Sequence, residues 1–344
     1  MVLRLLWEVR IWKEGVRAEV ILLLPRSMMS AFDNLRSSRG DFDRREFALS
    51  DRFNDICVFT PTYNRAYCLD KLFASLCDQT AENFNWLIVD DGSTDDTEAL
   101  VEDFKKVSPF PITYLKQANG GKQRAHNVAV EHCSSELFFC VDSDDQLVCD
   151  ALASIWEAWD DVRSSSDYAG VIALQGPGEN TPHYGRMPKG LRTTTMWDLY
   201  YKHGHRGDTA HIYKTSVLRD YPFEVEDGEK FIAETYVYHQ IDQRYKLAVL
   251  DKVVTIQEYL SDGYSKNVRQ VTRNNPKGYR KLKRMYILYA DTPRAYIEST
   301  ILYMVGCLLC GDAKGGIKDA PNKVGAVLAL LPAWILTKTE FRER

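Results

Sequence analysis

The sequence has no excess of positive charge. Its 344 residues include 44 Lys and Arg against 48 Asp and Glu, the formal net charge is −4, and the sequence pI is about 6.0. A chain that binds nucleic acid usually presents a basic face to the phosphate backbone. The composition therefore argues against nucleic acid as a partner.

Long apolar runs are also missing. Charged residues interrupt the N-terminal segment, so we expect no cleavable signal peptide, and the one-sided apolar residues of 2–16 predict an amphipathic helix. That helix packs on the protein or lies on a membrane, unless it is an over-extended start of the reading frame. The apolar runs of the C-terminal region are shorter than the roughly 18 residues that span a bilayer. We expect a cytoplasmic protein whose tail packs on its core or lies peripherally on the inner face of the cell membrane.

The eight cysteines are scattered, mostly within apolar segments. Free cysteine in such positions behaves as a small hydrophobic residue, which is typical of a reduced, cytosolic chain. Cys307 and Cys310 form one CxxC pair in an apolar helical run, with no second pair nearby. We therefore expect core packing there rather than a zinc site.

Strand-like runs alternate with helical patterns from about residue 54 onward. The expected strands are 56–60, 86–89, 112–115 and 137–141, and the expected helices are 69–77, 94–107, 122–132 and 147–159. This alternation predicts an α/β fold with a doubly wound, mainly parallel sheet. Ligands bind such sheets outside the carboxyl ends of the strands, and right-handed crossovers bring those ends to one edge.

Three carboxylates follow the expected strand 137–141. Asp142, Asp144 and Asp145 would repel one another unless a cation lay among them, so the pattern predicts a divalent metal. The alternative is that Asp145 caps the helix expected from residue 147.

Polar residues also follow the other expected strands. Asp90 and Asp91 either shape a strand-to-helix turn or accept hydrogen bonds from a ligand, and we expect Asp91 to contact it with support from Asp90. Residues 119–124 combine a Gly-rich turn with two cations, which suits a diphosphate. A plain turn with surface cations is the alternative, since neither a Walker A loop nor GxGxxG is present.

Four motifs in this order resemble the family 2 glycosyltransferases. They are TPTYNR at 60–65, VDDGSTD at 89–95, NGGK at 119–122 and VDSDD at 141–145, within a resemblance that covers about residues 56–278. The resemblance implies a GT-A fold, which is a Rossmann-like α/β sheet. It also implies a nucleotide-diphosphate-sugar donor, most often UDP-linked, and a divalent metal, Mn²⁺ or Mg²⁺, at the Asp-x-Asp pair.

The resemblance assigns roles to single residues of these motifs. The implied donor-binding set is Pro61, Tyr63, Arg65, Asp90, Asp91, Lys122, Asp142 and Asp144. Within it, Asp91 would contact the uracil or its equivalent, Lys122 would lie by the base or phosphates, and Asp142 would face the ribose or sugar. Asp144 would coordinate the metal, with Asp145 as a second ligand, because the departing nucleoside diphosphate carries charge that needs stabilising.

An acceptor hydroxyl needs a base to remove its proton as attack begins. Residues 228–238 resemble the family's acidic motif, which is Glu-Asp in many members and Ala233-Glu234 here. Glu234 is the candidate base, Glu229 the reserve, and Asp208 a candidate on the acceptor side. Alternatively, Glu234 merely occupies a first helical turn, where an acid is favourable by about 0.3–1 kcal/mol.

We therefore expect an inverting glycosyltransferase of a bacterial surface-polysaccharide branch, acting on a saccharide or lipid-linked acceptor. Two alternatives are an inactive nucleotide-sugar-binding assembly partner at the membrane and a nucleotidyltransferase, although the Gly-rich basic N-terminal loop of the latter is missing. The expected organisation is an amphipathic segment and linker at 1–53, a nucleotide-sugar-binding half at 54–163, an acceptor-binding half at 164–278 and a helical tail at 279–344.

Overall fold

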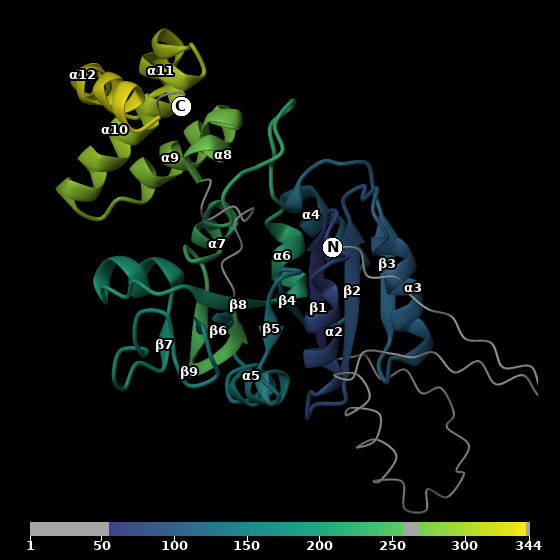
Figure 1. The fold of residues 1–344 in the computed structure, drawn as a ribbon. Helices are drawn as coiled ribbons and strands as arrows, with labels where there is room; N and C mark the ends of the chain where they lie inside the picture. Colours follow the sequence, from purple (N-terminus) through teal and green to yellow (C-terminus); the bar gives the residue numbers. More distant parts are fainter. Residues whose placement is uncertain (1–54, 258–267, 342–344) are drawn as a thin grey trace, which may run out of the picture. The chain divides into compact units, whose positions relative to one another are not determined.

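The computed structural model describes residues 55–257 and 268–341, which belong to one compact unit, Asp51–Arg344 (Figure 1). The amphipathic helix expected at 2–16 and the linker expected at 26–54 lie outside the described residues. The same holds for residues 258–267.

A mixed sheet forms the centre of the described chain. Its order is β3-β2-β1-β4-β8-β6-β9-β5, with β7 paired to β9. The strands are β1 (Ile56–Thr62), β2 (Phe84–Asp90), β3 (Ile112–Lys116), β4 (Leu137–Cys140), β5 (Gln146–Leu147), β6 (Tyr168–Gly176), β7 (Thr193–Thr194), β8 (Thr209–Lys214) and β9 (Lys246–Ile256). Strands β3, β2, β1 and β4 run parallel, as the sequence predicted, whereas β8 is antiparallel to both β4 and β6.

Helices cover both faces of this sheet. They are α2 (Leu69–Cys77), α3 (Thr97–Val107), α4 (Lys122–His132), α5 (Ala151–Asp160), α6 (Thr215–Asp220) and α7 (Thr235–Ile241), with a π-helix, η1, at Asp198–Lys202. Successive side chains of a strand point to opposite faces. Phe59 accordingly packs in one cluster with Ala125 of α4, and Val58 packs in the other with Leu69 of α2. The sheet therefore separates two hydrophobic cores.

The helix expected at 147–159 begins later than predicted. Gln146 and Leu147 form β5 instead, paired antiparallel with β9 at Ile256 and Thr255, and α5 starts at Ala151. Asp145 therefore does not cap this helix. The apolar run predicted one continuous helix, whereas the backbone groups of Gln146 and Leu147 are satisfied by a strand about 110 residues away. The local pattern does not show this partner.

The C-terminal region is helical, as predicted (Figure 1). It contains α8 (Val268–Asn274), α9 (Pro276–Tyr289), α10 (Pro293–Leu309), α11 (Ala313–Asp319) and α12 (Lys323–Thr339). Helix α9 runs through positions 278 and 279, where the acceptor-binding half was expected to end and the tail to begin. None of the described helices combines the length and apolar character needed to cross a bilayer.

Helix α12 continues through Pro332. Its alanine face, Ala326, Ala329 and Ala333, is buried in the cluster shared with α10, and this packing offsets the hydrogen bond that proline removes. Cys307 is fully buried in the same cluster, as expected for a cysteine that packs in a core.

Candidate active site

The carboxyl ends of β1 and β2 lie side by side, with Thr62 in register with Asp90. The loops that follow are joined, because the Asn64 amide donates to the Ser93 hydroxyl over 2.8 Å and the Thr94 amide donates to the Asn64 side chain over 2.8 Å. Asn64 has a φ of 53°, a left-handed conformation that Asn tolerates. This joined edge carries Pro61, half-buried, and Tyr63, 49% exposed.

Asp90 supports this edge from below. Its carboxylate is fully buried and accepts hydrogen bonds from the Ser93 amide (2.7 Å) and the Tyr114 hydroxyl (2.5 Å). Both bonds tie the end of β2 to neighbouring chain segments. Asp90 thus holds the shape of the loop that bears Asp91.

Asp91 holds the Gly-rich loop. Its carboxylate accepts hydrogen bonds from the amides of Gly120 (2.8 Å) and Gly121 (2.7 Å) and from the Gln117 side chain (2.7 Å). The expectation that these glycines form a diphosphate cradle is therefore corrected, because their amides already donate to a protein carboxylate. A carboxylate offers about four acceptor positions, so Asp91 retains one.

The same loop is clamped against residues 225–230. Arg124 donates to the carbonyl oxygens of Gly120 (2.8 Å), Glu229 (2.7 Å) and Glu226 (3.2 Å). Gly121 has a φ of +96°, and a Cβ atom there would lie 1.9 Å from the Lys230 carbonyl oxygen. The close approach requires glycine and brings the start of α4 against the chain that leads into α7.

Lys122, the first residue of α4, joins two predicted site residues. Its ammonium group lies 2.6 Å from an Asp142 oxygen and 2.8 Å from a Glu234 oxygen. Burial alone would lower the pKa of Lys122, but the two carboxylates outweigh it and hold that pKa well above its usual value. In turn, the charge of Lys122 lowers the pKa of Glu234 despite its burial. Glu234 is the N-cap residue of α7, as the helix-start alternative expects, although its side chain makes no cap hydrogen bond.

Asp144 and Asp145 have less compensation. Asp144 lies 3.6 Å from the Arg65 guanidinium, while burial and the nearby Asp142 raise its pKa. Burial, Asp142 and Asp144 raise the pKa of Asp145 to about 8, against one weak hydrogen bond from Gln257 at 3.4 Å. Hard oxygen donors that repel one another suit a hard divalent cation such as Mn²⁺ or Mg²⁺. These residues therefore fit the metal that the motif implies.

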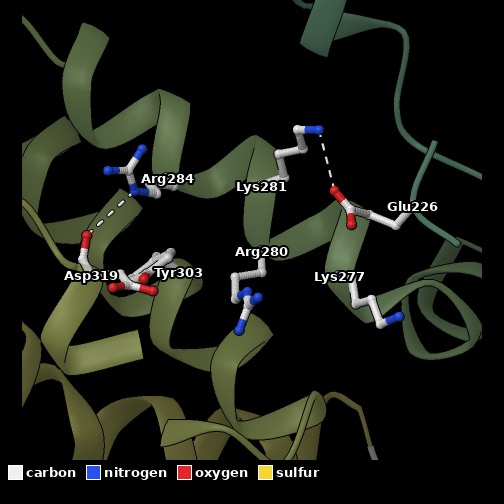
Figure 2. A pocket seen from close by; sticks show the side chains of 7 residues that line it. All are labelled: Glu226, Lys277, Arg280, Lys281, Arg284, Tyr303 and Asp319. Carbon is white, nitrogen blue, oxygen red and sulfur yellow. Dashed lines mark hydrogen bonds and ion pairs between the residues drawn. The ribbon is translucent and has the colours of Figure 1, made fainter. Parts of the chain in front are cut away.

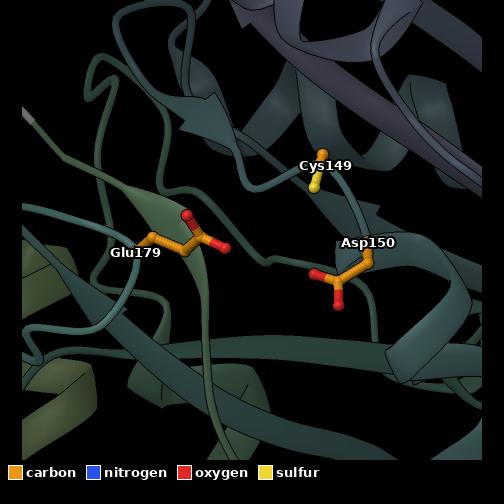
Figure 3. A group of neighbouring side chains, drawn as sticks. All are labelled: Cys149, Asp150 and Glu179. Atoms are coloured by element: carbon orange, nitrogen blue, oxygen red, sulfur yellow. The ribbon is translucent and has the colours of Figure 1, made fainter.

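The three aspartates do not converge as a closed metal cage. Within residues 55–257 and 268–341, the one group of three potential ligands whose ligand atoms lie within 4.8 Å of one another is Cys149, Asp150 and Glu179 (Figure 3). Cys149 and Glu179 are exposed, and Lys252 already pairs with Asp150. Hence a metal at Asp144 would take few protein ligands and complete its shell with phosphate oxygens and water.

Glu229 and Asp208 stand outside the Lys122 cluster. Both Glu229 oxygens accept backbone amides at the start of α9, from Lys277 (2.7 Å) and Gly278 (2.8 Å). Glu229 is thus a helix cap in this structure. Asp208 is exposed immediately before β8.

His211 was not among the site residues predicted from the sequence. This histidine is on β8, its pKa is lowered to about 4 by burial, and the charge of Glu234 acts on it in the opposite sense. Its ring centroid lies 4.9 Å from that of Tyr238. Recognising 209–214 as a strand next to β4 would have placed His211 near the site.

The sequence profile described as Glycosyl transferase family 2 matches residues 57–222. Poly(ribitol-phosphate) beta-N-acetylglucosaminyltransferase TarS of Staphylococcus aureus is 34% identical over 182 residues, which cover 50% of this chain and 30% of TarS. Minor teichoic acid biosynthesis protein GgaA of Bacillus subtilis is 27% identical over 196 residues, 54% of this chain and 42% of that protein. The chain thus spans less than half the length of these two relatives.

Solved structures show the same fold. The structure of S. aureus TarS 1–349 in complex with UDP has a TM-score of 0.53 at 20% identity and covers 83% of this chain and 80% of that one. Mannosyltransferase PcManGT from Pyrobaculum calidifontis, in complex with GDP-Man and Mn²⁺, has a TM-score of 0.50 at 15% identity and covers 92% and 89%. Residues 57–222 thus match the glycosyl transferase family 2 profile, and the chain has the GT-A fold that its motifs predict.

Proposed function

We propose that the protein is an inverting, metal-dependent glycosyltransferase that moves a sugar from a UDP-sugar to a saccharide or lipid-linked acceptor in polysaccharide biosynthesis. The observation that carries the proposal is the Lys122 bridge between Asp142 of the Asp-rich motif and Glu234 of the acceptor side. Relatives named for teichoic acid and teichuronic acid biosynthesis support the pathway class.

The donor lies along the joined edge of β1 and β2 in this proposal. Pro61, Tyr63 and Arg65 flank the nucleotide, and the fourth acceptor position of Asp91 receives an N–H of the base. The half-exposed ring of Tyr63 offers a stacking surface. The UDP complex of TarS supports UDP as the nucleotide.

Asp144 would hold the divalent metal, assisted by Asp145. Bound there, the cation stabilises the negative charge of the departing nucleoside diphosphate. Arg65, 3.6 Å from Asp144, adds positive charge on the same side. Lys122 adds a second cation next to Asp142, which faces the ribose or sugar.

Glu234 acts as the base in this proposal. Because Lys122 keeps its carboxylate ionised, Glu234 is able to accept the proton of the acceptor hydroxyl as the new bond forms. A lowered pKa makes it a weak base, so its contribution depends on its position next to the acceptor. Asp208 orients the acceptor. The complete Lys122 bridge favours this enzyme over an inactive nucleotide-sugar-binding partner.

We also propose that α12 lies on the cytoplasmic face of the membrane, close to lipid-linked acceptors. Its alanine face is buried, while six larger apolar side chains are 46–74% exposed. They are Val324, Val327, Leu328, Leu331, Trp334 and Ile335. The helix has no acidic residue and has lysines at both ends, Lys323 and Lys338, as suits an anionic lipid surface.

Calorimetric titration with UDP, GDP and TDP tests the donor site, in Mn²⁺ or Mg²⁺ and then in EDTA. We expect metal-dependent binding with a preference for UDP, followed by hydrolysis or transfer of a UDP-sugar. Asp144→Ala should lower metal-dependent donor cleavage by about 10²–10³-fold, the loss typical of one strong charge stabiliser. Near-wild-type turnover would refute the role of Asp144. Diphosphate binding without hydrolysis or transfer would favour the inactive assembly partner, and absence of diphosphate binding would contradict the donor site itself.

A further inference from the structure

A second polar cavity lies outside the Lys122 cluster, between α9, α10 and α11 (Figure 2). Its volume is about 310 Å³. The lining residues are Glu226, Lys277, Arg280, Lys281, Arg284, Tyr303 and Asp319. Four of these seven are cations, and all four come from α9.

The four cations occupy one face of α9, at positions 277, 280, 281 and 284. Like charges at this spacing destabilise a helix by roughly 0.2–0.5 kcal/mol per pair. Two of these cations form ion pairs. Arg280 pairs with Asp312 at 3.1 Å, and Lys281 pairs with Glu226 at 3.2 Å. These two charges are therefore compensated within the protein.

Lys277 and Arg284 are in a different position. Lys277 donates to the Asp227 carbonyl oxygen over 3.0 Å, and Arg284 donates to the Asp319 carbonyl oxygen over 3.4 Å (Figure 2). Across the described ranges of the chain, neither enters an ion pair. Two positive charges whose hydrogen-bond partners are neutral carbonyl groups thus border a water-accessible cavity, and the Asp319 carboxylate that also lines it offsets only one of them. The remaining excess of positive charge attracts an anion.

Phosphate matches these groups better than a carboxylate does. The guanidinium of Arg284 presents parallel N–H donors that fit two phosphate oxygens. Lys277, seven residues earlier on α9, adds a second positive charge at the other end of the cavity (Figure 2). A phosphate monoester or diester brings one to two negative charges, comparable to the excess positive charge of the lining. The cavity, at about 310 Å³, also leaves room for part of the group that carries the phosphate.

The cavity is mechanically joined to the candidate active site. Glu226 lines it and at the same time accepts a hydrogen bond from Arg124 of the Gly-rich loop through its carbonyl oxygen. Lys277 lines it while its backbone amide donates to Glu229, whose own carbonyl oxygen also accepts from Arg124. A ligand in the cavity would therefore contact the chain segment that positions Lys122.

We infer that this cavity is a phosphate-binding subsite that holds a phosphate group of the acceptor, with Lys277 and Arg284 as its principal ligands. The assignment of the phosphate to the acceptor rests on the proposed function, whereas the anion site itself does not.

Titration calorimetry with inorganic phosphate and with glycerol 3-phosphate tests the site, in EDTA so that metal at Asp144 does not contribute. Arg284→Gln and Lys277→Gln should each weaken phosphate binding by about 10-fold, because each removes a charge-assisted hydrogen bond. The matched control is Arg294→Gln on α10, whose side chain is 87% exposed and pairs only on the surface with Glu298. It should leave binding unchanged. Absence of phosphate binding by the wild type, or equal loss in all three variants, would overturn the site.

The carrier of the phosphate is identified with vesicles. Vesicles of phosphatidylglycerol that bind the wild type and release Arg284→Gln would support the phosphate site and name a lipid headgroup as its carrier. If Arg284→Gln instead lowers only the affinity for soluble glycerol 3-phosphate, the acceptor assignment is supported. Binding of either probe that is indifferent to Lys277→Gln and Arg284→Gln contradicts the inference.

Hydrolysis of a UDP-sugar without acceptor separates this inference from the proposed function. The cavity variants should retain wild-type hydrolysis, and their loss should appear as a raised KM for a phosphate-bearing acceptor relative to a neutral one. Phosphate binding without hydrolysis of the UDP-sugar would support the subsite and contradict the enzyme assignment. Hydrolysis without phosphate binding would do the reverse.

Discussion

The ammonium group of Lys122 compensates two carboxylates of the candidate active site. Asp142 and Glu234 come from opposite sides of the site, and one ammonium group within 2.8 Å of both keeps them together. Any anionic ligand that draws Lys122 away must leave these carboxylates less compensated. The residue is therefore a shared partner of the donor side and the acceptor side.

Glu234→Gln removes the candidate base while keeping its size. We expect transfer turnover to fall by about 10²–10⁴-fold, the usual contribution of a positioned base, with UDP affinity changed by only a few-fold. Steady-state kinetics and calorimetry measure the two quantities. Glu229→Gln is the matched control, because it alters the α9 cap and should lower stability by about 1 kcal/mol without a comparable loss of turnover. If the two variants exchange these outcomes, Glu229 is the base.

Gly121→Ala tests the close approach of the Gly-rich loop to Lys230. The backbone at Gly121 has a φ of +96°, which side chains rarely tolerate, and an added Cβ atom would lie 1.9 Å from the Lys230 carbonyl oxygen. Gly228→Ala is the control, since Gly228 has φ +80° and open space around its Cβ position. Backbone strain alone costs roughly 1–2 kcal/mol, so Gly228→Ala should lose about that much in urea unfolding and Gly121→Ala clearly more. Equal losses of unfolding free energy in the two variants would show that the Gly-rich loop moves away from Lys230 without further loss of stability.

At the level of elements, the strands and the polar clusters at their carboxyl ends were predictable from sequence. The apolar runs 56–60 and 86–89 are short and bounded by turn residues, so their length and their flanking residues both indicate strands. Strand β5 was not predictable, because two residues inside a longer apolar run pair with β9 far along the chain. Local pattern does not encode a partner at that separation.

The candidate site was predictable as a set of residues but not as a set of contacts. The motifs pointed to Lys122 and Glu234 separately, yet their ion pair joins residues more than 100 positions apart. Likewise, nothing near Asp91 in sequence indicates that it holds two glycine amides, and nothing near Glu229 indicates that it caps α9. These roles arise from tertiary packing.

Helix α12 leads to a prediction about lipid binding. Leu328 and Leu331 are 74% and 68% exposed, and burying one leucine in an apolar phase contributes about 1.5–3 kcal/mol. Leu328→Asn with Leu331→Asn should therefore lower sedimentation with phosphatidylglycerol vesicles by at least about 10-fold. Val107→Asn on α3, where the side chain is 52% exposed, is the control and should have no effect. Loss of a dimer in solution, with vesicle binding unchanged, would assign the face to a second copy instead.

At the scale of the whole molecule, stability should depend on buried neutral histidines. Burial lowers the pKa of His126 to about 3, that of His239 to about 3 and that of His211 to about 4. The unfolded chain binds a proton at each of these residues near pH 6.5, whereas the folded chain does not. Stability from these residues is therefore present above pH 6.5 and is lost as the pH falls below it.

His126→Leu isolates one of these contributions. His126 is 5% exposed and lies between the rings of Phe59 and Phe223, where an uncharged side chain fits. Between pH 7 and pH 5 the wild type should lose about 2 kcal/mol more unfolding free energy than the variant does. Urea titrations of both proteins at the two pH values measure this difference. Parallel losses would mean that His126 is protonated in the folded state.

Arg124 has a consequence for the order in which the protein is made. The carbonyl groups of Glu226 and Glu229 that it binds are synthesised more than 100 residues after it, roughly 5–20 s later at ribosomal rates. They also lie beyond residue 222, where the match to the family profile ends. During translation the emerging segment therefore has the Gly120 partner of the Arg124 guanidinium but not its Glu226 and Glu229 partners, and the Gly-rich loop is not yet clamped. A nascent chain stalled before residue 226 would hold the family's motifs without the contacts that lock them into one arrangement.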